Sequence, residues 1–221
     1  MALGKEPPTF RCRCSALGPL MTPSRSKSGG LSATAMSMLT LWYKEQLYGR
    51  RKEISSKYMT KGNDCEDASI EYLNKLDGTD YKKNEQYFED DIMHGTPDVI
   101  GEDIIIDIKN SWDFTTFPLF SKEIPSKEYM WQVQGYMMLT DKHKAQVVYT
   151  LMDLPDEQIE QEWRKNGGYG SYEDFVASHK YDGLADNLRV KRFDFEYDAE
   201  MADQIRDKVE EARKFISCLR Y

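Results

Sequence analysis

Two aspartates and a lysine lie close together in residues 96–109, where they alternate with aliphatic residues. Asp98 follows a proline, and Asp107 and Lys109 stand on either side of Ile108. Two neighbouring carboxylates suit Mg²⁺, a hard cation that binds oxygen ligands and keeps several waters. An ammonium beside them can orient a hydroxide and offset the charge of a phosphate. These residue types therefore indicate metal-assisted hydrolysis of a phosphodiester.

A β-hairpin is expected to position these side chains. Two short β-type runs flank Gly101-Glu102, which suits a two-residue type II′ loop. In that register Asp98 pairs with Ile105 and lies diagonally from Asp107. Because side chains alternate along a strand, both aspartates share a face with Lys109. The other face is expected to be the buried one and carries Ile104, Ile106 and Ile108. An ordinary half-exposed strand gives the same pattern and stays an alternative.

A helix over residues 61–78 is expected to bring a third carboxylate, that of Glu66. Asn63 is a suitable N-cap, and Gly78 can supply the left-handed turn after the last helical residue. Glu66 falls on the same helical stripe as two apolar residues, Ile70 and Leu73. The alternative is that Glu66 only completes a capping box with Asn63.

The pattern predicts further elements on both sides of this region. Helices are expected around residues 39–48, over 127–140, in pieces between 157 and 180, and in a closing segment around 201–216; strands are expected over 145–152 and 190–197. Gln132 and Tyr136 lie one turn apart on the helix over 127–140. They could steady the site, or they could belong to ordinary helix packing.

The order of these features resembles the PD-(D/E)XK nucleases of the group that includes lambda exonuclease, YqaJ-type viral recombinases and the RecB nuclease domain. The similarity covers about residues 58–152. It implies an α/β (α+β) fold of the restriction-endonuclease type, with a central mixed β-sheet flanked by helices and a C-terminal strand and helix added. It also implies a metal site, filled by Mg²⁺ or by Mn²⁺ as a substitute, with its residues at Glu66, Asp98, Asp107 and Lys109 and a following Gln132-to-Tyr136 motif.

Two departures from the group pattern narrow the resemblance. Asp107 stands where many relatives carry glutamate, which shortens the reach of the side chain by one methylene. The histidine ligand of the RecB-like branch has no match, because His94 lies just before the hairpin rather than in the preceding helix. This favours the viral exonuclease branch and a structural or exposed position for His94.

Composition is consistent with a single folded domain but gives a mixed message about nucleic acid. The chain has 221 residues, of which 40% are hydrophobic, and its net charge is −8. A negative sum opposes phosphate binding, which depends on Lys and Arg, so local clusters matter more than the total. Basic clusters occur at residues 49–52, 142–144 and 189–192, and each could also be solvated surface. We expect substrate contacts from Arg50, Arg51, Lys52 and Ser111.

Residues 1–30 are rich in Ser, Gly and Pro and show no hydrophobic periodicity, so a disordered leader is expected there, followed by one nuclease domain over 31–221. The four cysteines form no CxxC pair, which argues against a zinc site or a disulfide framework and favours reduced thiols. We expect a cytoplasmic protein without a membrane span, in a host cytoplasm if the source is viral; mitochondrial targeting by the leader is the alternative.

The expected function is metal-dependent DNA exonuclease activity in end processing for recombination or replication. The expected partners are double-stranded DNA with ends, a single-strand annealing or recombination protein, and further copies of the chain as a homo-oligomer. Two alternatives stay open: a structure-specific or restriction-type endonuclease of the same fold, and a catalytically silent nucleic-acid-binding subunit.

Overall fold

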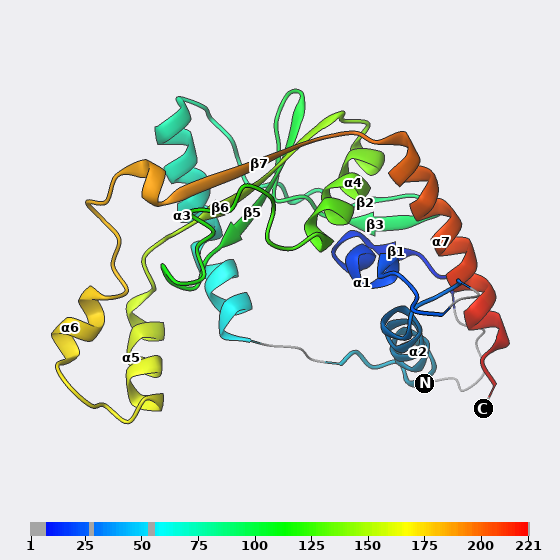
Figure 1. Ribbon diagram of the computed structural model, residues 1–221, viewed down its shortest axis with the longest axis horizontal. Coiled ribbons are helices and arrows are strands. Elements are labelled where there is room, and N and C mark those ends of the chain that lie inside the picture. The colour runs from blue at the N-terminus through cyan, green and yellow to red at the C-terminus, as the bar shows by residue number, and fades with distance from the viewer. Residues whose placement is uncertain (1–7, 27–28, 53–55, 221) are drawn as a thin grey trace.

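The structure is a computed structural model that describes residues 8–26, 29–52 and 56–220. Helices α5 and α6 project at one end of the molecule, whereas α1, α2 and α7 gather at the other end (Figure 1). Strands β5, β6 and β7 run between these two ends (Figure 1). Within the described residues, the model contains no helix with the length and apolar character that crossing a membrane requires.

The central sheet has four strands in the order β4-β5-β6-β7, with bounds β4 (Val99–Ile100), β5 (Ile104–Asn110), β6 (Lys144–Thr150) and β7 (Val190–Glu196). The pair β5/β6 is parallel, and the two outer pairs are antiparallel. A parallel pair needs a long crossover, and here it contains helix α4 (Glu128–Thr140). The sheet is therefore mixed, as expected from the sequence.

Helices cover both faces of this sheet. On one face, Ile105 and Val147 belong to the largest hydrophobic cluster, which also contains residues of α4 and of α7 (Ala199–Cys218). On the other face, Ile106 and Ile108 pack with residues of α3 (Lys57–Asp77). The expectation that only the face of Ile106 and Ile108 is buried was therefore wrong, because α4 and α7 cover the opposite face as well.

The N-terminal segment is part of the folded domain, so the prediction of a disordered leader over residues 1–30 was wrong for the part that the structure describes; residues 1–7 and 27–28 lie outside it. The segment contributes β1 (Cys12–Arg13), η1 (Cys14–Ala16) and α1 (Leu17–Met21), ahead of α2 (Ala33–Tyr48). Strand β1 joins a second small sheet in the order β1-β3-β2, completed by β2 (Phe88–Glu89) and β3 (Met93–Gly95).

The buried side chains of this segment explain why it is folded. Phe10, Leu17 and Leu20 all lie in the largest core cluster, and Leu17 and Leu20 are fully buried. Helix α1 approaches α4 closely at Gly135, where an added Cβ would lie 2.5 Å from Leu17 Cδ1. A glycine in the Gln132-to-Tyr136 motif thus makes room for the N-terminal segment.

Helix α3 begins earlier than expected. Ser56 is its N-cap and accepts a hydrogen bond from Met59 N, so Asn63 lies inside the helix and the capping-box interpretation of Asn63 and Glu66 was wrong. At the other end Gly78 adopts φ 68°, as expected for the left-handed cap. The missed start has a simple cause, since Lys57–Gly62 lacks an apolar periodicity.

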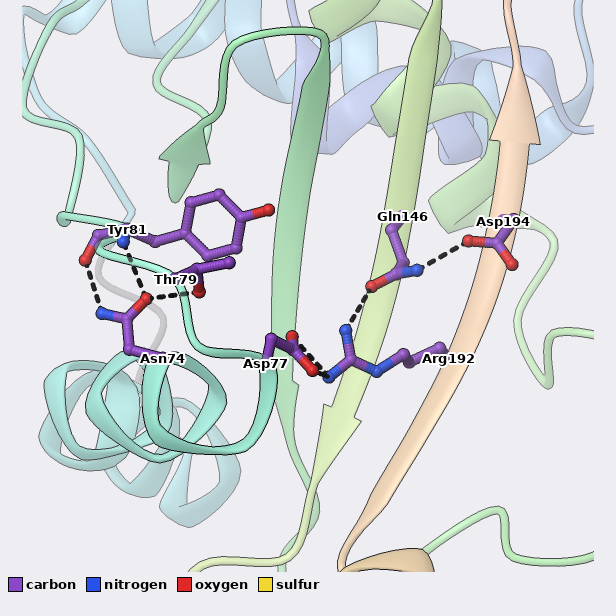
Figure 2. Close-up of polar contacts among 7 residues, drawn as sticks. All are labelled: Asn74, Asp77, Thr79, Tyr81, Gln146, Arg192 and Asp194. Carbon is purple, nitrogen blue, oxygen red and sulfur yellow. Dashed lines mark hydrogen bonds and ion pairs between the residues drawn. The ribbon is translucent and has the colours of Figure 1, made fainter.

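Polar contacts join the C-terminal end of α3 to the sheet (Figure 2). Arg192 on β7 donates to both carboxylate oxygens of Asp77, at 2.9 and 2.8 Å, and to Gln146 on β6 at 3.0 Å. Asn74 holds the following turn, because its side chain bonds both Thr79 and Tyr81 (Figure 2). These contacts fix the helix that carries Glu66 against β6 and β7, and β6 is the neighbour of the strand that carries Asp107.

A buried lysine joins the other end of α3 to two loops. The Lys61 side chain is fully buried, and its Nζ donates to Trp112 O at 2.9 Å and to Met152 O at 2.7 Å. These carbonyls follow β5 and β6 respectively. Lys61 therefore holds the loops at the C-terminal ends of two central strands.

The chain between β6 and β7 forms α5 (Asp156–Lys165), α6 (Tyr172–Ala177) and η2 (Asp186–Leu188). A small hydrophobic cluster connects it to the loop after β5 through Trp112, Leu154 and Ile159. The ion pair of Lys57 with Glu162, 2.9 Å, attaches α5 to the first turn of α3.

Candidate active site

The hairpin brings the two aspartates opposite each other. Val99 pairs with Ile106, and extending this register by one residue places Asp98 opposite Asp107. The predicted two-residue loop was wrong: Gly101 N donates to Ile104 O at 2.8 Å, and the shift moves the pairing by two positions. A shift of two keeps the same side chains on each face, so the aspartates become direct rather than diagonal neighbours.

Asp107 is fully buried and is held by side chains of two elements. Its Oδ1 accepts a hydrogen bond from Gln132 Nε2 on α4 at 2.9 Å, and the same Nε2 lies 3.2 Å from the Tyr136 hydroxyl. Its Oδ2 forms an ion pair with Lys109 Nζ at 2.7 Å and has no hydrogen bond to any other described residue. The Gln132-to-Tyr136 motif thus contacts the site directly and fixes one carboxylate oxygen.

Asp98 carries a strongly perturbed carboxyl group. Burial, together with the neighbouring charge of Asp107, raises the pKa of Asp98 to about 7, although Lys109 and a hydrogen bond from Ile108 N, 2.7 Å, act in the opposite direction. Burial opposes the charge of Lys109 too, but the carboxylates of Asp107 and Asp98 outweigh it and raise the lysine pKa. Lys109 therefore stays an ammonium. Its single positive charge cannot neutralise both carboxylates when Asp98 and Asp107 are ionised.

A cavity of about 530 Å³ opens beside these groups, and we call it the carboxylate cavity. Asp98, Glu66 and Lys109 line it, and the Lys109 ammonium lies 4.5 Å from the centre of the Tyr129 ring. Ser111, expected as a substrate contact, lines it as well. The cavity is within the size range of small-molecule sites.

Glu66 lines the cavity but forms no ready-made ligand set with the aspartates. Its Oε1 pairs with Lys83 Nζ at 3.2 Å, and Lys83 also lies 3.5 Å from Asp67. No cluster of three or more His, Cys, Asp or Glu side chains is arranged to hold a metal within the described residues. Glu66 would have to leave Lys83 to become a ligand.

The two aspartates nevertheless fit a hard divalent cation. The raised pKa of Asp98 reflects two carboxylates that share a buried place, and Asp107 Oδ2 has only the Lys109 ammonium for a partner among the described residues. An oxygen-preferring ion would relieve this unbalanced charge and match the donor set. Asp98 and Asp107 are therefore the residues suited to hold it.

A second cavity, of about 700 Å³, also has Asp98 in its wall. It is lined by four cationic side chains, and we call it the basic cavity: Arg11, Arg13, Arg51 and Lys52. Arg51 and Lys52 were expected as substrate contacts, whereas Arg50, expected with them, is exposed and does not line the cavity. His94 lies in its wall, half-buried and beside Tyr87, where burial and then Arg13 lower its pKa.

Several residues at these cavities were missed from the sequence. Arg11 and Arg13 were assigned to the disordered leader, although they alternate with Phe10, Cys12 and Cys14, a period of two that is typical of a strand. No sequence motif marks Lys83, because its partner Glu66 lies on helix α3, outside the loop that contains Lys83. Tyr58 and Tyr129 line the carboxylate cavity from helix starts where no motif marks them.

Comparison with known proteins supports this reading of the fold. Neither a protein-family model nor a curated protein matches the chain. The solved structure of a phage-related exonuclease from Haemophilus somnus 129PT is similar with a TM-score of 0.81 and 28% identity, over 95% of this chain and 94% of its own.

A more distant structure has the same fold. The alkaline exonuclease LHK-Exo from Laribacter hongkongensis gives a TM-score of 0.66 at 16% identity, over 94% of this chain and 88% of its own, and its complex with dAMP gives 0.67. The two LHK-Exo structures support the fold assignment. The phage-related exonuclease also has 28% sequence identity over 95% of this chain. In its fold, the chain is therefore similar to a phage-related exonuclease and to an alkaline exonuclease, which is consistent with the resemblance to the lambda exonuclease group of the PD-(D/E)XK nucleases.

Proposed function

We propose that this chain is a Mg²⁺-dependent DNA exonuclease that hydrolyses phosphodiester bonds from strand ends. The observation that supports it most is the buried Asp107 carboxylate, paired with the Lys109 ammonium and placed opposite Asp98, where both Asp98 and Lys109 line an open cavity. A pure binding subunit would gain nothing from two carboxylates where a phosphate must come close. The likeness to a phage-related exonuclease supports the exonuclease activity. A role in end processing for recombination or replication, with a strand-annealing protein as partner, is part of this proposal.

Each residue of the site has a definite task in this proposal. Asp98 and Asp107 hold the ion, Mg²⁺ or its substitute Mn²⁺, and Glu66 joins them on release from Lys83. When bound, the ion polarises the phosphate and favours ionisation of water. Lys109 stays protonated against Asp107 and presents its remaining N–H groups to the attacking oxygen or the phosphate.

The basic cavity supplies a place for the strand end. It shares Asp98 with the carboxylate cavity, so a strand that reaches the ion can leave its terminal phosphate among Arg13, Arg51 and Lys52. Arginine can bind phosphate through two parallel hydrogen bonds. An enzyme that holds a terminal phosphate needs an end and would spare closed circles.

One assay tests the proposal: linear duplex, nicked circles and covalently closed circles are incubated with Mg²⁺, Mn²⁺ or chelator. We expect linear DNA to be degraded to short products, closed circles to persist, and chelator to stop the reaction. Asp107→Asn, which keeps the size of the side chain, is the negative control. Equal cleavage of closed circles would establish the endonuclease alternative, and binding without cleavage by the unaltered chain would establish the silent subunit.

A second assay tests the basic cavity. Linear substrates carry a phosphate or a hydroxyl at the 5′ end or the 3′ end, and each is given to the unaltered chain, to Arg51→Ala and to Arg50→Ala. We expect a preference for one phosphorylated end that Arg51→Ala reduces about tenfold or more, since charge-assisted bonds contribute about 1.5–3 kcal/mol. Arg50→Ala is the matched control, because Arg50 does not line the cavity. Equal effects of the two substitutions would contradict this placement of the strand end.

A further inference from the structure

One end of the carboxylate cavity is aromatic and takes no part in the chemistry described above. Tyr58, from the first turn of α3, and Trp112, from the loop after β5, form this end. Their ring centres are 5.8 Å apart and the planes cross at 72°. The wall of the cavity therefore combines the charged groups of Asp98 and Lys109 with an aromatic pair, Tyr58 and Trp112, that contacts neither of them in any recorded interaction among the described residues.

The two rings differ in what they can offer a ligand. Trp112 is buried, packs against Leu154 and Ile159, and carries the Lys57 ammonium 4.3 Å from its ring centre. It is therefore a fixed support. The Tyr58 ring contacts Trp112 edge to face and has the Lys57 ammonium 5.7 Å from its centre, yet the residue is 55% exposed, so part of the ring surface remains accessible. An exposed, supported ring in a cavity wall suits another flat, apolar surface.

A second observation in the same cavity points to a ligand. Ser111 is buried, lines the cavity, and its Oγ has no hydrogen-bond partner among the described residues. A buried hydroxyl without a partner is unfavourable, because it loses water and gains nothing in exchange. Rotation of the Ser111 side chain toward the cavity would let this hydroxyl donate to a ligand oxygen. Neighbouring Asn110, by contrast, already accepts bonds from Ser69 and Thr150.

We propose that the Tyr58–Trp112 end of the carboxylate cavity is a nucleobase subsite, which stacks one unpaired base of the nucleotide beside the bond that is cut. In this arrangement Ser111 donates to an oxygen of the sugar-phosphate, and the cut phosphate lies at Lys109. The inference rests on the proposed function, since it assumes that DNA enters this cavity. A base inside a duplex has both faces covered, so the subsite selects an end nucleotide that has left its stack. Every base has a stacking face, so little sequence preference follows.

Binding of short single strands in chelator tests the subsite without turnover. Two oligonucleotides are compared with a normal one: each lacks a single base, at the 5′-terminal or at the 3′-terminal nucleotide. For the unaltered chain, we expect removal of the base at one end to weaken binding about 5- to 100-fold, the effect of about 1–3 kcal/mol of stacking. Tyr58→Ala should bind the normal strand as weakly as the base-free one, so that the difference disappears.

Control variants separate stacking from loss of structure. Tyr58→Phe keeps the ring and should keep the difference. Tyr169→Ala removes an 86% exposed ring that does not line the cavity and should also keep it. Ser111→Ala should weaken the normal and the base-free strand by the same factor.

The outcomes distinguish the subsite from the proposed function. A difference that persists in Tyr58→Ala, or that is absent from the unaltered chain at both ends, overturns the subsite. If that chain still degrades linear DNA with Mg²⁺, the nuclease proposal survives this failure. If the unaltered chain binds no oligonucleotide and cleaves no DNA, both proposals are wrong.

Discussion

At the scale of single residues, the buried charge of Asp98 lowers the stability of the metal-free protein. Its pKa of about 7 in the folded chain lies far above the ordinary value of 3.8, so the folded state holds this proton more tightly than the unfolded state does. The stability of the metal-free protein should therefore fall as the pH rises from about 4 to about 7. The ion that the site is suited to hold would reverse this loss.

Asp98→Asn should consequently stabilise the metal-free protein at pH 8 while it abolishes cleavage. The amide keeps an acceptor for Ile108 N but has no charge to bury. Each kcal/mol gained raises Tm by about 2–4 °C in a domain of this size. Thermal unfolding in chelator at pH 4 and pH 8 measures the change in Tm caused by Asp98→Asn. Asp103→Asn, in the exposed hairpin loop, is the control. A Tm at pH 8 below that of the unaltered chain would contradict the assigned charge imbalance.

Gln132 acts through Asp107 and should affect metal affinity. Gln132→Leu removes the hydrogen bond that orients Asp107 Oδ1, and we expect Mn²⁺ binding to weaken about 10–100-fold, as for other residues that orient metal ligands. Calorimetric titration with Mn²⁺ gives this number. Gln146→Leu, the same change on β6 in the contact group of Figure 2, should leave it unaltered. If Gln132→Leu binds Mn²⁺ with unchanged affinity, Gln132 contributes to helix packing and does not position Asp107 for the metal.

The sequence was informative about residues whose types carry chemistry. Asp98, Asp107, Lys109 and Gln132 were predicted to lie together, and in the structure they do. The ion pair of Glu66 with Lys83 could not be predicted, because it depends on how the turn after α3 folds back onto the helix. Spacing along a chain reports residues that share an element, and it reports contacts between elements poorly.

At the scale of elements, the N-terminal segment is a stabilising part of the hydrophobic core. Deleting residues 1–26 should therefore unfold the domain or lower Tm by many degrees, since it removes several buried side chains that each contribute about 1.5–3 kcal/mol. Deletion of residues 1–7 alone is the matched comparison, so that the difference between the two truncations measures the contribution of residues 8–26. Circular dichroism melts of both truncations decide the matter, and equal Tm values for the two would show that residues 8–26 contribute no stability.

Lys61 should give α3 an unusual pH response. Burial lowers the pKa of Lys61 to about 8, so between about pH 8 and 10.5 the unfolded state binds more protons and stability rises with pH. Lys61→Met should lack this rise, a difference of at most about 3 kcal/mol. Urea unfolding of the two proteins from pH 7 to 10 measures it. Lys75→Met, on the exposed face of the same helix, should retain the rise, and its loss there would show that another group titrates.

Helices and long strands were easier to predict than their ends and registers. The helix over 127–140 and the strand over 190–197 match α4 and β7 closely, because their patterns are long. The predicted hairpin loop was wrong because Gly101-Glu102 suits a two-residue turn locally, whereas the pairing of Ile100 with Ile105 requires a four-residue loop. The prediction of disorder for residues 8–26 was wrong because the composition of the segment is typical of a disordered chain, whereas the alternation from Phe10 to Cys14 is typical of a strand.

For the whole molecule, a net charge of −8 makes DNA binding a local matter. If the four cations of the basic cavity hold the strand end as proposed, the plot of log affinity against log salt should have a slope of about −2 to −3 for single strands, at about 0.7 per phosphate contact. Arg51→Ala should reduce the slope by about 0.7. Titrations in chelator over a range of salt test this, and a steeper slope would mean that a wider surface contacts the backbone.

The burial of the N-terminal segment also affects how the chain is made. The residues of η1 and α1 pack on α4, and Arg213 of α7 donates to Phe10 O at 3.0 Å, so an early part of the domain is completed by its last helix. At about 5–20 residues per second, roughly 10–40 s separate the synthesis of these partners. During that time Phe10, Leu17 and Leu20 have no final place in the core. The nascent chain should therefore expose these apolar side chains, and depend on chaperones, until α7 is synthesised.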